Sequence, residues 1–273
     1  MKVKKEIACA AVGRYVVLSE AIVAIRLHRL AEAGASQKPM EGRVPVDQDL
    51  TRVIDSPLAC AERRLIGVLV RRLPAAVTPD VLTAAGVLGA LVTFVGYAAC
   101  AYADAFIWIA SLGLVLHWFG DSLDGSLARH RRIERPRYGF FLDQNIDVLG
   151  NLLIAGGLAA SPYIRWESAA VCLIGYHMLS IYALVRAVVE REFHLTVFSS
   201  GPTEVRLLII AMNVLIATFG APQWEVAGMT FTWADTVVCA FGIGMALTFV
   251  LLLVRHAPRL RAADDAERAH RSS

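Results

Sequence analysis

Long apolar stretches separated by short polar segments dominate the chain from residue 81 onward. Six of these stretches are close to the ~20 residues that a helix needs to cross a bilayer. They cover 81–102, 106–129, 139–160, 168–190, 204–220 and 231–254. The composition agrees, because 56% of all residues are hydrophobic, whereas soluble domains have about 45–50%. The pattern predicts an all-α, polytopic membrane protein whose six transmembrane helices form a domain over 77–256.

A juxtamembrane amphipathic helix is predicted over 57–76, directly ahead of the first span. Four leucines line one of its faces: Leu58, Leu65, Leu69 and Leu73. Four arginines supply its charge: Arg63, Arg64, Arg71 and Arg72. A helix of this kind typically lies on an anionic membrane surface. An ordinary soluble amphipathic helix is the alternative.

The segment before this helix, 1–56, is predicted to be a cytoplasmic extension and linker. We expect a helix over about 15–32, followed by a linker over 34–56 that is rich in Gly, Ser, Pro, Gln and Asp. A signal peptide is an alternative, because basic residues precede an apolar run. Arg14 and Glu20 interrupt that run, however, and no clear cleavage site follows it.

The distribution of charge orients the predicted spans, although the net charge is only +3. Basic residues gather on one side, at Arg63, Arg64, Arg71, Arg72, Arg129, Arg131, Arg132, Arg135, Arg137, Arg186, Arg191, Arg206, Arg255, Arg259 and Arg261. The loops of the other side hold Asp104, Arg165, Glu167 and Glu225, and therefore one basic residue. By the positive-inside rule, we expect a multi-pass protein of the cell (inner) membrane with both termini in the cytoplasm, including a tail over 257–273.

Four carboxylates interrupt the apolar sequence of the second and third spans. Asp121 and Asp124 are three residues apart, and Asp143 and Asp147 are four apart. On helices, each spacing places its two side chains on one face. A bare carboxylate in a membrane costs roughly 3 kcal/mol on insertion scales. Since no basic residue is expected beside them at this depth, a divalent cation is the natural compensation, and a purely polar contact between helices is the alternative.

The same stretch resembles the signature of the CDP-alcohol phosphatidyltransferase family (class I), which reads Asp-x2-Asp-Gly-x2-Ala-Arg, a short gap, then Gly-x3-Asp-x3-Asp. Every fixed position is matched: Asp121, Asp124, Gly125, Ala128, Arg129, Gly139, Asp143 and Asp147. The resemblance extends over roughly 60–255. It implies an enzyme of phospholipid biosynthesis that transfers a phosphatidyl-type group from a CDP-linked lipid to a polar alcohol and releases CMP.

The resemblance also implies roles for the carboxylates. The four aspartates, Asp121, Asp124, Asp143 and Asp147, would bind two metal ions, and Asp147 would also act as general base for the acceptor hydroxyl. Mg²⁺ or Mn²⁺ suits ligands that are all oxygen, and we expect no Cys or His near the aspartates, which argues against zinc. The five cysteines are scattered singly and are expected to be packing residues.

The remaining signature residues would contact the substrate. Gly125 lets a nucleotide approach the backbone, and Ala128 keeps the same helical face open. Arg129 can bind a phosphate with two parallel hydrogen bonds. Gly139 is expected to let the third span begin close to its neighbour.

Two helix starts add further candidates. The sequence Thr-Pro-Asp-Val-Leu-Thr at 78–83 resembles the family's Thr-Pro-Asn-x-Leu-Thr and would bring Asp80 and Thr83 to the nucleotide, with plain helix capping as the alternative. The segment 201–204 precedes Arg206, which could line a rim for an anionic alcohol or lipid phosphate, with Arg186 as a second donor. Here too a capping turn is the alternative. For His117 and His177 we expect structural roles.

Two rival functions stay open. Within the family, the phospho-head-group of a CDP-linked alcohol can instead be transferred to diacylglycerol. A carboxylate-lined cation transporter would require acidic residues near the middle of the bilayer and inverted repeats, and the sequence has neither. The acceptor alcohol is not determined, because inositol phosphate, glycerol phosphate and serine enzymes share the signature. The expected partners are both substrates, the lipid bilayer and, from the resemblance, a second copy of the chain, but no nucleic acid.

Overall fold

The computed structural model describes residues 57–190, 202–226 and 228–271. The helix predicted over about 15–32 and the linker over 34–56 lie outside the described residues. Within the described ranges the chain forms seven α-helices, all of them in one compact unit. They are α2 (Pro57–Arg72), α3 (Pro79–Ala99), α4 (Ile107–Arg131), α5 (Pro136–Ala160), α6 (Trp166–Glu190), α7 (Pro202–Phe219) and α8 (Trp233–Arg271). The all-α prediction is confirmed.

Two short elements join the helices. The 3-10 helix η1 (Asp104–Phe106) leads into α4. Strands β1 (Gln223–Val226) and β2 (Met229–Thr232) pair antiparallel between α7 and α8. Gly228 lies in their turn with φ of 76°, a left-handed conformation that glycine adopts without steric cost. This hairpin was not predicted, because it is only four residues long on each side.

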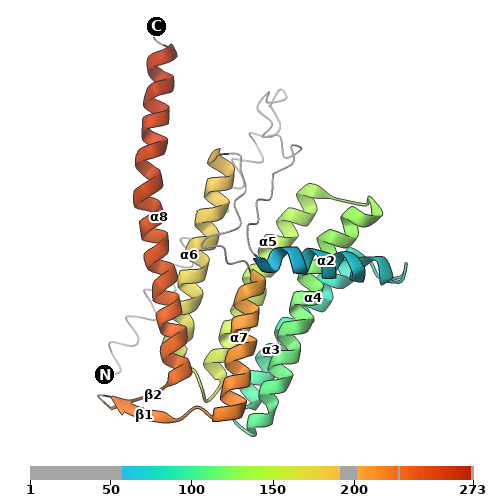
Figure 1. Ribbon diagram of the computed structural model, residues 1–273, viewed down its shortest axis with the longest axis vertical. Helices are drawn as coiled ribbons and strands as arrows, with labels where there is room; N and C mark the ends of the chain where they lie inside the picture. Colours follow the sequence, from blue (N-terminus) through green and yellow to red (C-terminus); the bar gives the residue numbers. More distant parts are fainter. Residues whose placement is uncertain (1–56, 191–201, 227, 272–273) are drawn as a thin grey trace, which may run out of the picture. The chain divides into compact units, whose positions relative to one another are not determined.

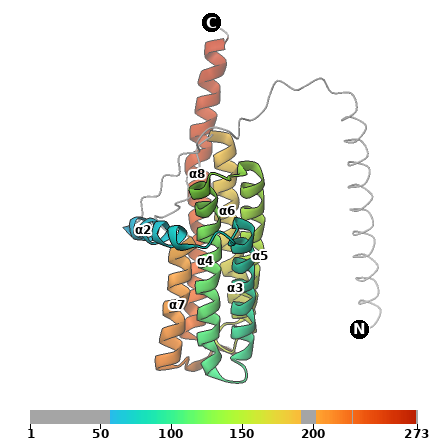
Figure 2. The same cartoon turned by 90° about the vertical axis from the view of Figure 1, so that its right-hand side faces the viewer.

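Helices α3 to α8 run roughly side by side, and α2 lies across them on the side of α4, which it contacts (Figures 1 and 2). The most extensive contact is between α3 and α4; α5 packs on α3, α6 on α5, α8 on α6, and α7 on α4. A Cβ atom on Gly120 would collide with the backbone of Leu82 and Gly86 on α3. Small residues of this kind let membrane helices approach closely, and here they fix α3 against the part of α4 that leads into Asp121.

Five of the described helical segments are long and apolar enough to cross a membrane: Pro79–Ala99, Asp104–Arg131, Trp166–Glu190, Pro202–Phe219 and Trp233–His270. A polytopic membrane protein is therefore confirmed. Helix α5, the third predicted span, has 25 residues but also carries Arg137, Asp143 and Asp147, and it is not among the five. The number of six spans stays a prediction. Helix α8 continues well past the predicted limit at residue 254 and includes Pro258.

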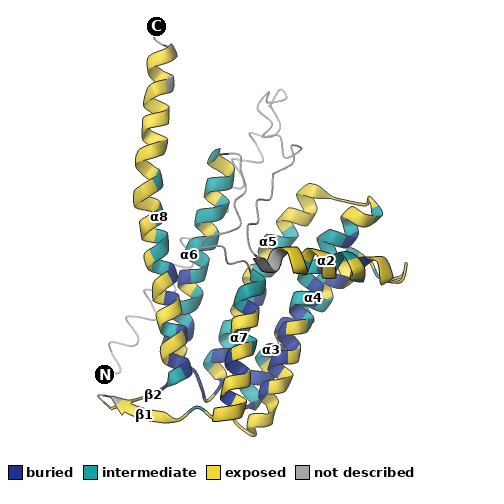
Figure 3. Ribbon diagram, in the orientation of Figure 1, coloured by how far each residue is buried: buried dark blue, intermediate teal, exposed yellow. Residues whose placement is uncertain are grey.

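Many large apolar side chains are exposed on the outer surface. Most of α8 is exposed along its length (Figure 3). In a membrane these side chains would face lipid. The interior instead contains a polar connection between three helices. The Tyr97 hydroxyl donates to Asn213 Oδ1 at 2.8 Å, and Asn213 Nδ2 donates to Ser111 Oγ at 3.0 Å. This chain of hydrogen bonds ties α3 and α4 to α7.

The apolar face predicted for α2 is partly wrong. Leu69 does pack inward, but Leu65 is 49% exposed. The side chains that pack against α3 and α4 are Ile66, Leu69, Val70 and Leu73, which meet Leu82, Leu123 and Leu127. The packed stripe is set by contact with α4 and not by the leucine positions alone. The side chain of Leu58 is not described.

Helix α2 also ends at Arg72 rather than near residue 76. The Arg131 guanidinium, at the end of α4, donates to the carbonyl oxygens of Val77 and Pro74 at 2.5 and 2.8 Å. These two carbonyl oxygens therefore have hydrogen-bond donors although α2 does not continue through the segment. Arg131 therefore holds the α2–α3 connection against the end of α4 that carries the signature.

Candidate active site

Three of the four predicted carboxylates come together between α4 and α5. Among the described residues, Asp121, Asp143 and Asp147 each offer one carboxylate oxygen, and these oxygens all lie within 4.8 Å of one another. All three side chains are half-buried. The i, i+4 spacing of Asp143 and Asp147 places both on the face of α5 that meets α4.

Asp124 faces α3 instead. Its Oδ2 accepts a hydrogen bond from Thr83 Oγ1 at 2.7 Å, and its Oδ1 accepts from the Gly125 amide at 2.5 Å. The predicted site residue Thr83 therefore contacts one of the four carboxylates, that of Asp124. Asp80 is exposed in the first turn of α3, where Thr78 Oγ1 caps the helix by accepting from the Val81 amide at 3.3 Å.

The donor set fits a hard divalent cation. The grouped ligands are carboxylate oxygens, which Mg²⁺ and Mn²⁺ prefer. Several carboxylates gathered in an apolar bundle repel one another unless a cation neutralises them. The clustered aspartates could hold such an ion, and Asp124 lies one turn beyond Asp121 on the same helix.

Arg206 of α7 lies inside the site and not on a rim. Its Nη2 donates to Asp121 Oδ2 at 2.6 Å, and its side chain is only 9% exposed. The prediction that no basic residue accompanies the carboxylates at depth is therefore wrong, because α7 packs directly on α4 and brings in a residue that is distant in sequence. The available signal was a single arginine inside an apolar span, which usually marks a functional partner.

His117 holds the other side of Arg206. It is fully buried, one turn before Asp121 on α4. Its Nδ1 lies 3.0 Å from the Gly86 carbonyl oxygen, and its Nε2 lies 3.3 Å from Arg206 Nη2. Because a carbonyl oxygen only accepts, these partners assign the proton to Nδ1 and leave Nε2 as an acceptor from Arg206. The expectation that no histidine lies near the aspartates is wrong, although His117 faces the guanidinium.

The remaining signature residues line the end of α4. Arg129 lies over Gly125, since a Cβ on Gly125 would come within 3.5 Å of Arg129 Nη1. Arg129 Nη2 also donates to Ser126 Oγ at 3.2 Å. Ala128 is half-buried on the following turn.

The expectation for Gly139 is wrong. It is exposed, and beyond its own stretch of helix no heavy atom of the described residues lies within 4 Å of a Cβ built on it. Helix α5 begins earlier, at Pro136, so the close approach of its neighbours does not depend on this glycine.

A carboxylate of α2 was missed entirely. Glu62 Oε1 accepts from Trp118 Nε1 of α4 at 2.9 Å and from Thr203 Oγ1 of α7 at 2.6 Å. In the sequence, Glu62 could have been singled out as the one acidic residue of α2, next to four arginines.

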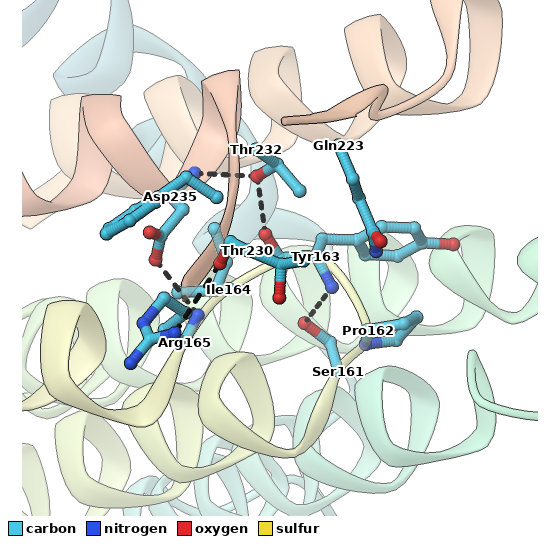
Figure 4. A pocket seen from close by; sticks show the side chains of 10 residues that line it. Ser161, Pro162, Tyr163, Ile164, Arg165, Gln223, Thr230, Thr232 and Asp235 are labelled. Carbon is cyan, nitrogen blue, oxygen red and sulfur yellow. Dashed lines mark hydrogen bonds between the residues drawn. The ribbon is translucent and has the colours of Figure 1, made fainter. Parts of the chain in front are cut away.

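A second polar region lies at the opposite end of the bundle, between the α5–α6 loop and the hairpin (Figure 4). It lines an open pocket of about 210 Å³. Thr232 Oγ1 donates to the Tyr163 carbonyl at 2.7 Å, and the Arg165 amide donates to Asp235 Oδ1 at 2.9 Å. Burial raises the pKa of Tyr163, and its hydrogen bond to Asp104 raises that pKa further. No signature residue lines this pocket, and its contacts fasten the loop to the start of α8.

An apolar helical bundle with carboxylates from two facing helices near one end defines a polytopic membrane protein with a candidate metal centre. A sequence model of the CDP-alcohol phosphatidyltransferase family matches residues 76–255, and the chain belongs to this family. It is thus a membrane transferase of phospholipid biosynthesis, as the signature predicted.

Two curated relatives are similar to the chain. A phosphatidylinositol phosphate synthase of Cutibacterium acnes is 29% identical over 191 residues, which cover 67% of this chain and 86% of the relative. An archaetidylinositol phosphate synthase of Pyrococcus horikoshii is 38% identical over 79 residues, which cover 29% of this chain and 41% of the relative.

Proposed function

We propose that this protein transfers the phosphatidyl-type group of a CDP-linked lipid, such as CDP-diacylglycerol, to inositol phosphate and releases CMP. The observation that carries the proposal is the buried Arg206 guanidinium beside the carboxylate cluster, at 2.6 Å from Asp121. A guanidinium in this position suits an acceptor that carries its own phosphate. Both relatives are named for products that contain inositol phosphate.

The four aspartates, Asp121, Asp124, Asp143 and Asp147, would hold two divalent ions, Mg²⁺ or Mn²⁺. When bound, such ions neutralise the pyrophosphate and the departing CMP. The protein itself binds and orients both substrates. Arg129 lies where it can donate to a nucleotide phosphate, and Gly125 and Ala128 leave the adjoining face of α4 open.

Asp147 is the proposed general base. It takes the proton from the acceptor hydroxyl, whose oxygen forms a bond to the lipid-side phosphorus of the CDP-lipid. The pyrophosphate bond breaks, and CMP leaves with the bonding electron pair. The proton stays on Asp147 until solvent removes it. Arg206 orients the acceptor through its phosphate, and Thr83 holds Asp124 by the hydrogen bond described above.

The arginine distribution supports an active site that faces the cytoplasm, with both termini on the same side of the cell membrane. Helix α2 would lie at the membrane surface. A soluble nucleotide donor head and a phosphorylated alcohol would reach the site from that side. The proposal divides the chain into a juxtamembrane segment over 57–76, a six-span domain over 77–256 and a tail over 257–273. It also includes a homodimer.

A substrate panel tests the function. Purified protein in lipid would receive CDP-diacylglycerol with inositol phosphate, inositol, glycerol phosphate or serine, and lipid products would be identified by mass spectrometry. We expect a phosphatidylinositol phosphate product and CMP with inositol phosphate. Product only from a CDP-linked alcohol and diacylglycerol would support the reverse arrangement, and metal uptake into vesicles without CMP release would support a transporter.

A further inference from the structure

We infer that Glu62 of α2 is a positioning residue that sets the place of Arg206 beside Asp121. The juxtamembrane helix would thereby be a structural part of the active site. This inference rests on the proposed function, in which Arg206 binds the phosphate of the acceptor.

One oxygen atom joins three helices. Glu62 Oε1 accepts from the Trp118 indole of α4 at 2.9 Å and from the Thr203 hydroxyl of α7 at 2.6 Å. Hydrogen bonds to an ionised acceptor are shorter and stronger than neutral ones. All three side chains are half-buried, so water competes with these bonds only in part.

The two partners of Glu62 lie one turn away from the ion pair of the site. Trp118 precedes Asp121 by three residues on α4, and Thr203 precedes Arg206 by three residues on α7. Residues at this spacing share one face of a helix. The Glu62 bridge and the Arg206–Asp121 pair are therefore two successive connections between the same two helices.

Helix α7 touches α4 far less extensively than α3 does. Deeper in the bundle, Asn213 of α7 bonds to Ser111 of α4. At the end near the site, α7 is joined to α4 by the Glu62 bridge, by the Arg206–Asp121 ion pair and by the contact of Arg206 with His117. Loss of the bridge would let the first turn of α7 move, and a misplacement of about 1 Å at a reacting site can cost about 100-fold in rate.

The alternative is that Glu62 only anchors α2 to the bundle. Helix α2 has a second anchor, because Ile66, Leu69, Val70 and Leu73 pack into the cluster around Leu123. An anchoring role would change the behaviour of α2 and leave the acceptor site unaltered. A positioning role would change the KM for the acceptor more than that for the CDP-lipid.

The kinetic test compares Glu62→Ala with Glu62→Gln. Glu62→Ala should raise the KM for inositol phosphate about tenfold, the size of one hydrogen bond to a charged acceptor. The KM for the CDP-lipid should stay near that of the unaltered protein. The amide oxygen of Glu62→Gln can still accept both bonds, so this variant should recover most of the loss. Thr203→Val removes one donor and should give a partial effect, while Cys60→Ala, an exposed change on the same helix, should give none.

A double-mutant cycle asks whether Glu62 acts through Arg206. In an Arg206→Gln background, Glu62→Ala should add less than about a twofold loss, since the group it positions is gone. Independent losses that simply multiply would overturn the inference. So would a tenfold loss that affects the KM of both substrates equally.

Hydrogen exchange measured by mass spectrometry in lipid nanodiscs tests the bridge without any activity. Glu62→Ala should speed exchange in 202–210 of α7, Glu62→Gln should not, and 233–245 of α8 should be unchanged in both. Unchanged exchange in 202–210 would overturn the inference even if the enzyme is active. If exchange changes as expected but no acceptor supports CMP release, the bridge stands and the proposed function fails.

Discussion

Arg206 and Asp121 are 85 residues apart in the chain, yet Arg206 Nη2 lies 2.6 Å from Asp121 Oδ2. The pair connects α7 to the carboxylates between α4 and α5. It places a buried positive charge beside the group of residues that the family signature marks. Substrate selection and metal binding would therefore meet at one aspartate.

Replacing Arg206 should affect both binding and stability. Arg206→Gln leaves Asp121 without its ionic partner, and breaking a buried pair typically costs about 3–5 kcal/mol, with the lower end expected here because Asp121 is 20% exposed. The variant should melt earlier in thermal unfolding, and added Mg²⁺ should recover more stability than it does in the unaltered protein. The KM for inositol phosphate should also rise, while an Asp265→Asn control on the exposed part of α8 should match the unaltered protein.

Asp143 and Asp147 share one helical face but should differ in function. A general base is typically worth about 10²–10⁴-fold in rate. Asp147→Asn should thus lose turnover while CDP-lipid binding stays closer to normal, whereas Asp143→Asn should weaken both. Binding and single-turnover rates at saturating Mg²⁺ would separate them. If Asp147→Asn loses binding as badly as Asp143→Asn, Asp147 is chiefly a ligand and the base lies elsewhere.

The Tyr97–Asn213 hydrogen bond should contribute to stability and not to chemistry. Tyr97→Phe removes the donor and should lower the unfolding free energy by about 1 kcal/mol. Asn213→Leu should cost more, because it leaves Tyr97 and Ser111 without their buried partner. Turnover per folded molecule should be retained in both. A large loss of turnover at unchanged melting temperature would contradict the structural role.

The membrane orientation can be tested by labelling. A single cysteine placed in 131–137, in a variant without the native cysteines, should react with an impermeant maleimide only after the cells are opened. The arginines of this loop motivate the expectation, through the positive-inside rule. Labelling in intact cells would show that the site faces outward, and a cysteine near Glu225 should give the opposite pattern as a control.

Local sequence patterns predicted the helices and the signature residues of this protein. Contacts between residues far apart in the chain could not be predicted in this way. The apolar spans and the signature were visible because hydropathy and spacing are properties of contiguous sequence. Arg206 at Asp121 and Glu62 at Thr203 depend on which helices pack together, which no single segment encodes. The α2 face was misassigned for the same reason, since Leu65 and Val70 are both apolar and only contact with α4 selects Val70. The role expected for Gly139 was wrong because a match to a fixed position of the signature does not reveal what surrounds that residue in the fold.

The most direct measurement is metal-dependent CMP release by the unaltered protein and by Asp121→Asn, Asp124→Asn and Asp143→Asn, each supplied with CDP-diacylglycerol and inositol phosphate. We predict one CMP for each phosphatidylinositol phosphate formed, an absolute requirement for Mg²⁺ or Mn²⁺, and loss of turnover in all three variants, because each removes a negative ligand. Near-normal turnover in the three variants at unchanged Mg²⁺ demand would contradict the carboxylate metal site. CMP release that does not depend on inositol phosphate would contradict the proposed acceptor.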